Sequence, residues 1–394
     1  MSTIKKMTWL MVTIMAIMAL PYIGGYIYCQ GVFPDHYFQY PPLSAPEKAP
    51  FNMTVAIVFA VINITWIILY LFPSLIGFKK YTDPKPAESK QKLKLPIWFW
   101  IGMVMWAGTL VVMWGHFSGP KLLLNWADLP LFWGFTLVLD GLVYVRNNGN
   151  SIIAKYPQEI VGIGVASISG WLLFEYLNFF VDDNWFYPFG NLIPDNEFTL
   201  YAVLGSAGLF PMAFEWYHLL RTFKFFKFRF SNGPKLDLPS WFKTGVLIGC
   251  LLSLFFIAMY PEILFGFLWV SPLLIVAIVL GKLGIWTPFV PIKNGNWTPL
   301  LISATTYLIQ GLLCECWNYF SGTHDAAGVL IETFNPNYWV YSLPYVNVWH
   351  VFEMPLLGVQ GYLPFGTYCL VWWITFAYLL NIPTRLFNDE ATEV

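Results

Sequence analysis

The chain is divided into blocks of about twenty apolar residues, and most of its charged residues lie in the segments between the blocks. An α-helix of this length crosses the hydrocarbon core of a bilayer, which is about 30 Å thick. Only 11% of the residues are charged and 57% are hydrophobic, so a water-soluble core could not bury the apolar surface. The sequence therefore predicts an all-α polytopic membrane protein with about eleven transmembrane helices, at 9–28, 53–78, 96–116, 127–145, 160–181, 200–220, 241–260, 263–285, 298–320, 339–358 and 363–382.

The basic residues predict the orientation of these helices. Lys5 and Lys6 precede the first block as in a signal peptide, but no small-residue cleavage site follows, so we expect this helix to be retained. With the N-terminus in the cytoplasm, 18 of the 21 Lys and Arg residues fall on the inner side, and only Lys48, Lys121 and Arg385 fall outside. This asymmetry is typical of a multi-pass protein of the inner (cytoplasmic) membrane.

Two parts of the chain resemble each other. Residues 92–102 and 235–245 agree at seven of eleven positions, each time directly before an apolar block. Farther along, Glu-Tyr-Leu-Asn-Phe-Phe at 175–180 is echoed by Glu-Cys-Trp-Asn-Tyr-Phe at 315–320. Such internal similarity indicates a duplicated structural unit.

The duplication predicts how the chain is organised. We expect two N-terminal helices and a basic loop (1–94), a first repeat of four helices (95–237), a second repeat of four helices (238–360), and a last helix with a tail (361–394). Because an even number of crossings returns the chain to the same side, the two repeats should be parallel and related by a pseudo-two-fold axis along the membrane normal.

Five acidic residues fall inside the predicted helices. A carboxylate at membrane depth costs about 2.5–3.5 kcal/mol on insertion scales, so such residues are rare and usually face the interior of the bundle. The candidate catalytic residues are Glu175, Glu215, Glu315 and Glu353, and the candidate substrate-binding residues are Asn178, Asn318, His218, His350 and Asp140. A spacing of three residues places each Glu/Asn pair on one helix face, where the amide could bond the carboxyl group across one turn.

At these acidic positions the chain resembles the lycopene-cyclase-domain proteins of bacteria and archaea, small multi-span units that occur as paired or fused copies with glutamates inside the membrane. The resemblance covers about 95–360, and it extends to other multi-pass proteins with the same duplicated plan. That family tends to carry a Pro-x-Glu-Glu element, whereas Pro211 to Glu215 and Phe352 to Pro355 each contain a single Glu.

The resemblance implies isomerisation, by cyclisation, of a polyisoprenoid or carotenoid-like lipid. A proton is delivered to a terminal double bond in a dry pocket, and a base removes a proton afterward. A buried glutamate can hold that proton because burial disfavours the charged form, and aromatic walls can stabilise the cation. This chemistry needs no cofactor.

Other functions remain open from the sequence. The protein could be a non-catalytic subunit of a larger membrane complex that binds a quinone, a pigment or another lipid. It could conduct protons or ions, or use its polar side chains only to join helices. A di-metal site is disfavoured because the Glu/His order is reversed at His350 and Glu353, so we predict no metal. The expected partners are membrane lipids and an apolar small molecule or pigment, with no nucleic acid, since the net charge is −1.

Overall fold

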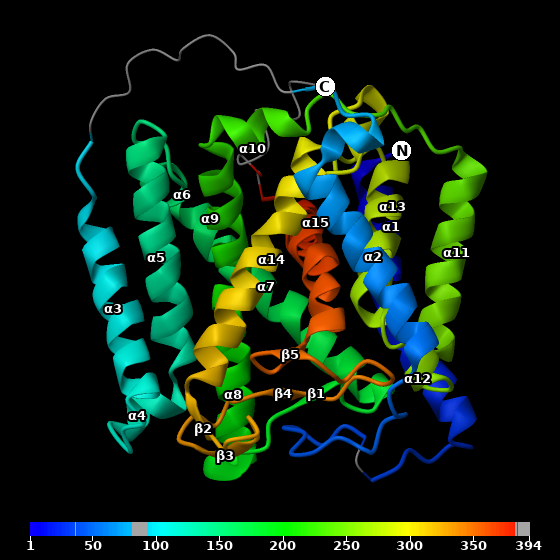
Figure 1. Cartoon of the computed structure of the whole chain (residues 1–394). Helices are drawn as coiled ribbons and strands as arrows, with labels where there is room; N and C mark the ends of the chain where they lie inside the picture. Colours follow the sequence, from blue (N-terminus) through cyan, green and yellow to red (C-terminus); the bar gives the residue numbers. More distant parts are fainter. Residues whose placement is uncertain (36, 81–92, 383, 385–394) are drawn as a thin grey trace.

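The computed structural model describes residues 1–35, 37–80, 93–382 and 384, and its described part is dominated by long helices (Figure 1). The long helical segments are α1 (Thr3–Tyr28), α2 (Met53–Leu71), α3 (Ile97–Trp114), α5 (Asp128–Arg146), α7 (Pro157–Asn178), α8 (Asp195–Gly205) with α9 (Leu209–Arg221), α11 (Ser240–Phe256), α13 (Phe267–Lys282), α14 (Thr298–Tyr319) and α15 (Tyr362–Leu379). Seven helical segments in the described ranges are long and apolar enough to cross a bilayer. The chain is a multi-pass helical membrane protein.

Short elements connect these helices. At the end where α1 begins, they are η1 (Pro73–Ile76), α6 (Ile152–Lys155), α10 (Lys224–Arg229) and η5 (Val290–Asn294). At the opposite end they are α4 (Lys121–Asn125), α12 (Pro261–Leu264), η2 (Phe179–Val181), η3 (Gly190–Leu192) and the strands. The 3-10 segment η4 (Ser206–Gly208) joins α8 to α9. The span predicted at 200–220 is therefore a helix interrupted near its middle.

The prediction of a transmembrane helix at 339–358 is wrong. This stretch forms strands β4 (Val340–Tyr341), β5 (His350–Val351) and β6 (Met354–Pro355) and part of η6 (Leu356–Gly361). Its aromatic content imitates a span, but prolines at 344 and 355 interrupt helical hydrogen bonding, and Tyr345, Trp349 and Phe352 have positive φ. With one span fewer, α15 returns to the end of the bundle at which α1 begins (Figure 1).

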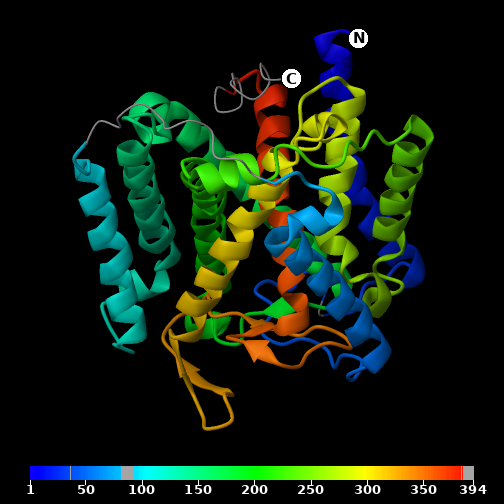
Figure 2. The same ribbon diagram turned by 45° about the horizontal axis from the view of Figure 1, so that its top comes forward.

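Three strand pairs and several loops form a layer across the other end of the bundle (Figure 2). β1 (Trp185–Phe186) pairs with β4, β2 (Gly322–His324) pairs with β3 (Leu330–Thr333), and β5 pairs with β6, all antiparallel. The segment that joins α1 to α2 belongs to this layer, since the backbone N–H of Tyr187 donates to the carbonyl of Pro42 (2.8 Å). We call this the end layer.

Helix contacts follow the same pattern in the two halves of the chain. α5 packs against α3 and α9, and α13 packs against α11 and α15. In the centre, α7 and α14 each contact both α9 and α15. The duplication stays a prediction, but the helix that matches α9 in this pattern is α15 rather than the stretch at 339–358.

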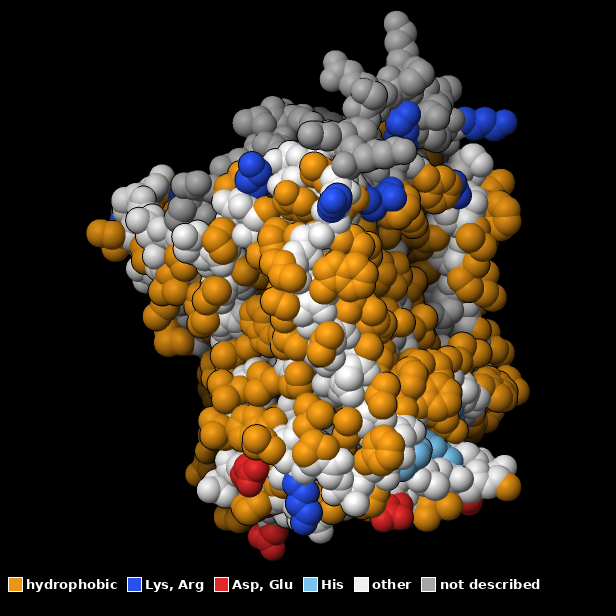
Figure 3. All heavy atoms as spheres, turned by 90° about the vertical axis from the view of Figure 1, so that its left-hand side faces the viewer, with side chains coloured by type: hydrophobic (Ala, Val, Ile, Leu, Met, Phe, Trp, Pro, Cys, Tyr) orange, Lys and Arg blue, Asp and Glu red, His pale blue; other side chains and the backbone are white. Residues whose placement is uncertain are grey.

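Charged side chains are separated between the two ends of the molecule. On the face in Figure 3, Lys and Arg gather at the end where α1 begins, Asp and Glu at the end layer, and apolar side chains fill the band between them. Lys85, Lys90, Lys92 and Arg385 of the predicted charge pattern lie outside the described residues. An apolar band between polar ends is the surface that a bilayer requires.

Candidate active site in the central cavity

A cavity lies between the central helices, next to the end layer. Its volume is about 100 Å³, which corresponds to roughly seven to ten water molecules. Helices α5, α7, α8, α9, α13, α14 and α15 and strands β1 and β4 contribute to its wall. The polar and aromatic residues that line it are Tyr40, Asp128, Trp171, Glu175, Trp185, Tyr187, Ser206, Trp269, Tyr307, Cys314, Glu315, Asn337, Trp339, Tyr341, Tyr362 and Phe365.

Glu175, near the end of α7, faces this cavity with a side chain that is fixed by aromatic donors. The hydroxyl of Tyr187 donates to its Oε1 at 2.6 Å, and Nε1 of Trp185 lies 3.4 Å from the same oxygen. Both donors come from the strand β1 region directly after α7. Only 5% of Glu175 is exposed, so its carboxyl group is held inside the protein.

Glu315, near the end of α14, has a closely similar environment. Nε1 of Trp339 (3.1 Å) and the hydroxyl of Tyr341 (2.9 Å) donate to its Oε1. The hydroxyl of Tyr362, at the start of α15, adds a third donor at 2.7 Å. Its second oxygen, Oε2, is buried and has no hydrogen-bond partner among the described residues. Trp-x-Tyr segments therefore hold both glutamates.

The predicted hydrogen bonds between each glutamate and its asparagine are wrong. Nδ2 of Asn178 donates instead to the carbonyl of Trp185, and Nδ2 of Asn318 to the carbonyl of Trp339, both at 2.8 Å. The amides therefore hold the two Trp-x-Tyr segments in place. β1 and β4 then pair with each other, Trp185 opposite Tyr341, which brings the two glutamate environments to one cavity.

Asp128 is a third carboxyl group in the cavity, and the sequence analysis did not identify it. It begins α5 and is 5% exposed. Nδ2 of Asn337 donates to its Oδ2, and its backbone N–H donates to the hydroxyl of Tyr201 (3.1 Å). Because Asp128 stands at the edge of a predicted span, the sequence gave no signal that it is buried.

Glu215 and Asp140 lie together, away from this cavity. They form a carboxyl pair between α9 and α5. Asp140 accepts hydrogen bonds from Nε1 of Trp98 (2.9 Å), Oγ of Ser151 (2.8 Å) and the backbone N–H of Ile153 (2.9 Å). Neither carboxyl group lines the cavity, so their prediction as residues of one common site with Glu175 is wrong.

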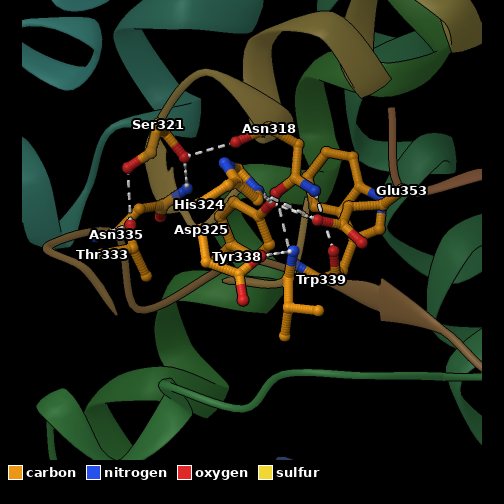
Figure 4. A network of polar contacts seen from close by, with 10 residues as sticks. Asn318, Ser321, His324, Asp325, Thr333, Asn335, Tyr338, Trp339 and Glu353 are labelled. Atoms are coloured by element: carbon orange, nitrogen blue, oxygen red, sulfur yellow. Dashed lines mark hydrogen bonds and ion pairs between the residues drawn. The ribbon is translucent and has the colours of Figure 1, made fainter. Parts of the chain in front are cut away.

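Glu353 and His350 lie in the end layer rather than on a helix. Oε1 of Glu353 accepts from the hydroxyl of Tyr338 and lies 3.3 Å from Nε2 of His324, which is stacked on the ring of Tyr319 (Figure 4). His350 is exposed in β5 and contacts Oδ1 of Asn347 (3.3 Å). The predicted match of Glu353 with Glu215 is wrong, since the two residues have different neighbours.

His218 does not belong to the cavity either. It lies in the last turn of α9, close to Arg221, and its Nε2 has no hydrogen-bond partner among the described residues. Of the nine predicted site residues, the structure thus brings Glu175 and Glu315 to the cavity wall, with Asn178 and Asn318 bonded to the strand residues behind it. In the described part of the chain, no cluster of three or more His, Cys, Asp or Glu residues could hold a metal ion.

A charged pair in the end layer lies near the cavity floor. Nζ of Lys48 donates to the carbonyls of Val181 (2.8 Å) and Asp182. Burial lowers the pKa of Lys48 to about 8, against the attraction of Asp182 and Asp183. Burial raises the pKa of Asp183 to about 7, while the positive charge of Lys48 acts in the opposite direction.

Comparison of the chain with protein-family models, with curated proteins and with solved structures finds no match. The candidate site must therefore be interpreted from its own geometry.

Proposed function

We propose that the protein binds one end of a polyisoprenoid lipid, such as a carotenoid precursor, in the central cavity and isomerises it by acid–base chemistry. The observation that supports this proposal is the placement of Glu175 and Glu315 on the wall of one cavity lined by indole and phenol rings. Both carboxyl groups are buried and oriented by hydrogen bonds from aromatic donors. The resemblance to lycopene-cyclase-domain proteins, expected at these positions, agrees with this chemistry.

The reaction balances without an added reactant. One carboxyl group gives its proton to a terminal carbon–carbon double bond, and a carbocation forms on the neighbouring carbon. A second double bond of the chain attacks that carbon and closes a ring. A carboxylate of the cavity then removes a proton from an adjacent carbon, so the product is an isomer of the substrate and the protons are restored.

Each part of the wall has a role in this scheme. Three carboxyl groups without a neighbouring basic residue favour keeping at least one proton in the cavity, because like charges repel. The hydrogen bonds to Oε1 of Glu315 leave its Oε2 free of protein partners, so that oxygen can carry the proton that is transferred. The aromatic faces stabilise the cationic intermediate.

Two further parts of the proposal concern the setting of this site. We infer that the cavity lies between two duplicated units, with α15 as the fourth helix of the second unit. We also infer a cytoplasmic location for the basic end of the bundle, as the positive-inside rule predicts. The cavity would then lie toward the outer side of the inner membrane.

Expression of the chain in cells that make lycopene tests the activity. The extracted pigments should shift to products with one or two rings, and Glu175→Gln or Glu315→Gln should reduce the shift at least tenfold. Glu215→Gln and Glu353→Gln are matched controls, because they remove carboxyl groups that lie outside the cavity; the shift should persist in both. Unchanged pigment with the wild-type protein present in the membrane would refute the isomerase proposal, and lycopene that copurifies unchanged would favour a binding subunit.

A further inference from the structure

The side chains around the central cavity carry acidic but no basic groups. Asp128, Glu175 and Glu315 line the cavity, and no Lys, Arg or His does so among the described residues. All three carboxyl groups are at least 95% buried. Any two of them that are ionised repel each other, and this repulsion is strong where water is excluded. A positive charge that enters the cavity would relieve it.

The aromatic wall is also suited to a positive charge. Trp171 and Trp185 (ring centroids 5.9 Å apart) and Trp185 and Trp269 (5.4 Å) form a continuous row of indoles, and Trp339 completes the set on the other side of the strand pair. Cations are attracted to the faces of aromatic rings, most of all to tryptophan. The indole N–H groups of Trp185 and Trp339 bond to the glutamates, which fixes the orientation of both rings.

Two buried polar atoms at the cavity have no partner within the described protein. They are Oε2 of Glu315, on a residue that is 1% exposed, and the hydroxyl oxygen of Tyr40. Buried polar atoms are normally satisfied by a hydrogen bond or by a ligand. Both unpartnered atoms are oxygens, which can accept a proton from an ammonium group or lie against its positively polarised carbons.

We propose that the central cavity is a binding site for an organic cation, a small ammonium group of the quaternary or tertiary type. The volume of about 100 Å³ admits a group of a few heavy atoms, such as trimethylammonium, but not a bulky polycation. Carboxylates supply the opposite charge and the four indoles supply the surface for the methyl groups. This binding does not require the isomerase reaction, so it goes beyond the function proposed above.

The test compares choline with its neutral isostere 3,3-dimethyl-1-butanol on the full-length protein in neutral detergent. Tryptophan fluorescence and the melting temperature are measured as each compound is added, at constant ionic strength maintained with NaCl. Choline should change the fluorescence in a saturable manner and raise the melting temperature, and the neutral compound should do so at least tenfold less effectively. Equal effects of both compounds, or none from choline, would overturn the proposal.

Variants and lipids locate the site and its source. Glu315→Gln should weaken choline binding about tenfold, which corresponds to about 1.4 kcal/mol, whereas Glu262→Gln, a carboxylate of α12 outside the cavity, should leave it unchanged. If Glu315→Gln does not fold, the comparison of choline with its isostere on the wild type decides alone. Weaker choline binding in phosphatidylcholine nanodiscs than in phosphatidylglycerol nanodiscs would identify a lipid headgroup as the occupant, and equal binding would identify a free amine.

The two proposals fail separately. Selective choline binding without a pigment change keeps the cation site and removes the isomerase. A pigment change without choline selectivity does the reverse, because the wall would then act on an apolar substrate alone.

Discussion

Asp183 shows how a single residue can make the stability of this protein depend on pH. It follows Asp182 in the turn after α7, and both residues have positive φ, 53° and 56°, a conformation that aspartate tolerates better than most residues. Its side chain is 3% exposed, with Lys48 as the nearby positive charge. Because burial raises the pKa of Asp183 from 3.8 to about 7, the folded protein binds a proton that the unfolded chain releases between these values.

The linkage predicts that this residue's contribution to stability falls as pH rises from about 4 to 7, because the unfolded state binds fewer protons than the folded state in that range. Asp183→Asn removes the titrating group, so its melting temperature should fall by a few degrees less than that of the wild type between pH 5 and pH 7. Thermal unfolding in detergent across this range measures the difference. Parallel curves for the two proteins would show that Asp183 does not titrate as the structure implies.

At the scale of elements, the close approach of α3 and α5 depends on two glycines. A Cβ atom on Gly102 would lie 2.5 Å from the carbonyl oxygen of Gly134, and a Cβ on Gly134 would lie 2.7 Å from the backbone nitrogen of Trp106. Small residues of this kind let transmembrane helices pack backbone to backbone. The aligned Gly245 of α11 has no atom within 4 Å of its Cβ position, so the shared sequence motif serves different packing in the two halves.

Gly102→Val should therefore force α3 away from α5 and destabilise the protein by about 1–3 kcal/mol, the usual cost of overpacking. Gly108→Val is the matched control, since a Cβ at Gly108, on the same helix, meets no atom within 4 Å. The melting temperatures of the two variants measure the effect. Equal losses would indicate that helix propensity, not helix contact, sets the cost.

The elements also show what the sequence could and could not predict. Apolar blocks located the helices well, because length and hydropathy depend only on local composition. The stretch at 339–358 misled the same criterion, since its aromatic residues belong to the end layer. The glutamates of the cavity were found through their membrane depth, but Asp128 was missed, because only the folded chain brings Asn337 and Tyr201 to it. Similarly, the Trp-x-Tyr echo was visible, but its spacing from each glutamate differs between the halves, so its role depended on the pairing of β1 with β4.

The whole molecule makes a prediction about topology. Since 339–358 is not a helix, α1 begins and α15 ends at the same end of the bundle (Figure 1), and the positive-inside rule places that end in the cytoplasm. A green fluorescent protein fused after Leu379 should therefore fluoresce in bacterial cells. Alkaline phosphatase inserted between α3 and α4 should be active, because the loop at 115–120 would face the periplasm. A dark fusion after Leu379 with an active phosphatase there would restore an odd number of crossings.

The strand pair β1–β4 carries a consequence for the origin of the cavity. One strand comes from each half of the chain, so a polypeptide cut in the 230–239 connection would give two fragments, each with an unpaired strand edge and an incomplete ring of indoles. Neither fragment alone could enclose the carboxyl groups; association of the two would be required. If the halves descend from one ancestral unit, that unit had to work as a dimer, and fusion of two genes then allowed Tyr362 and Asp128 to arise on one side only.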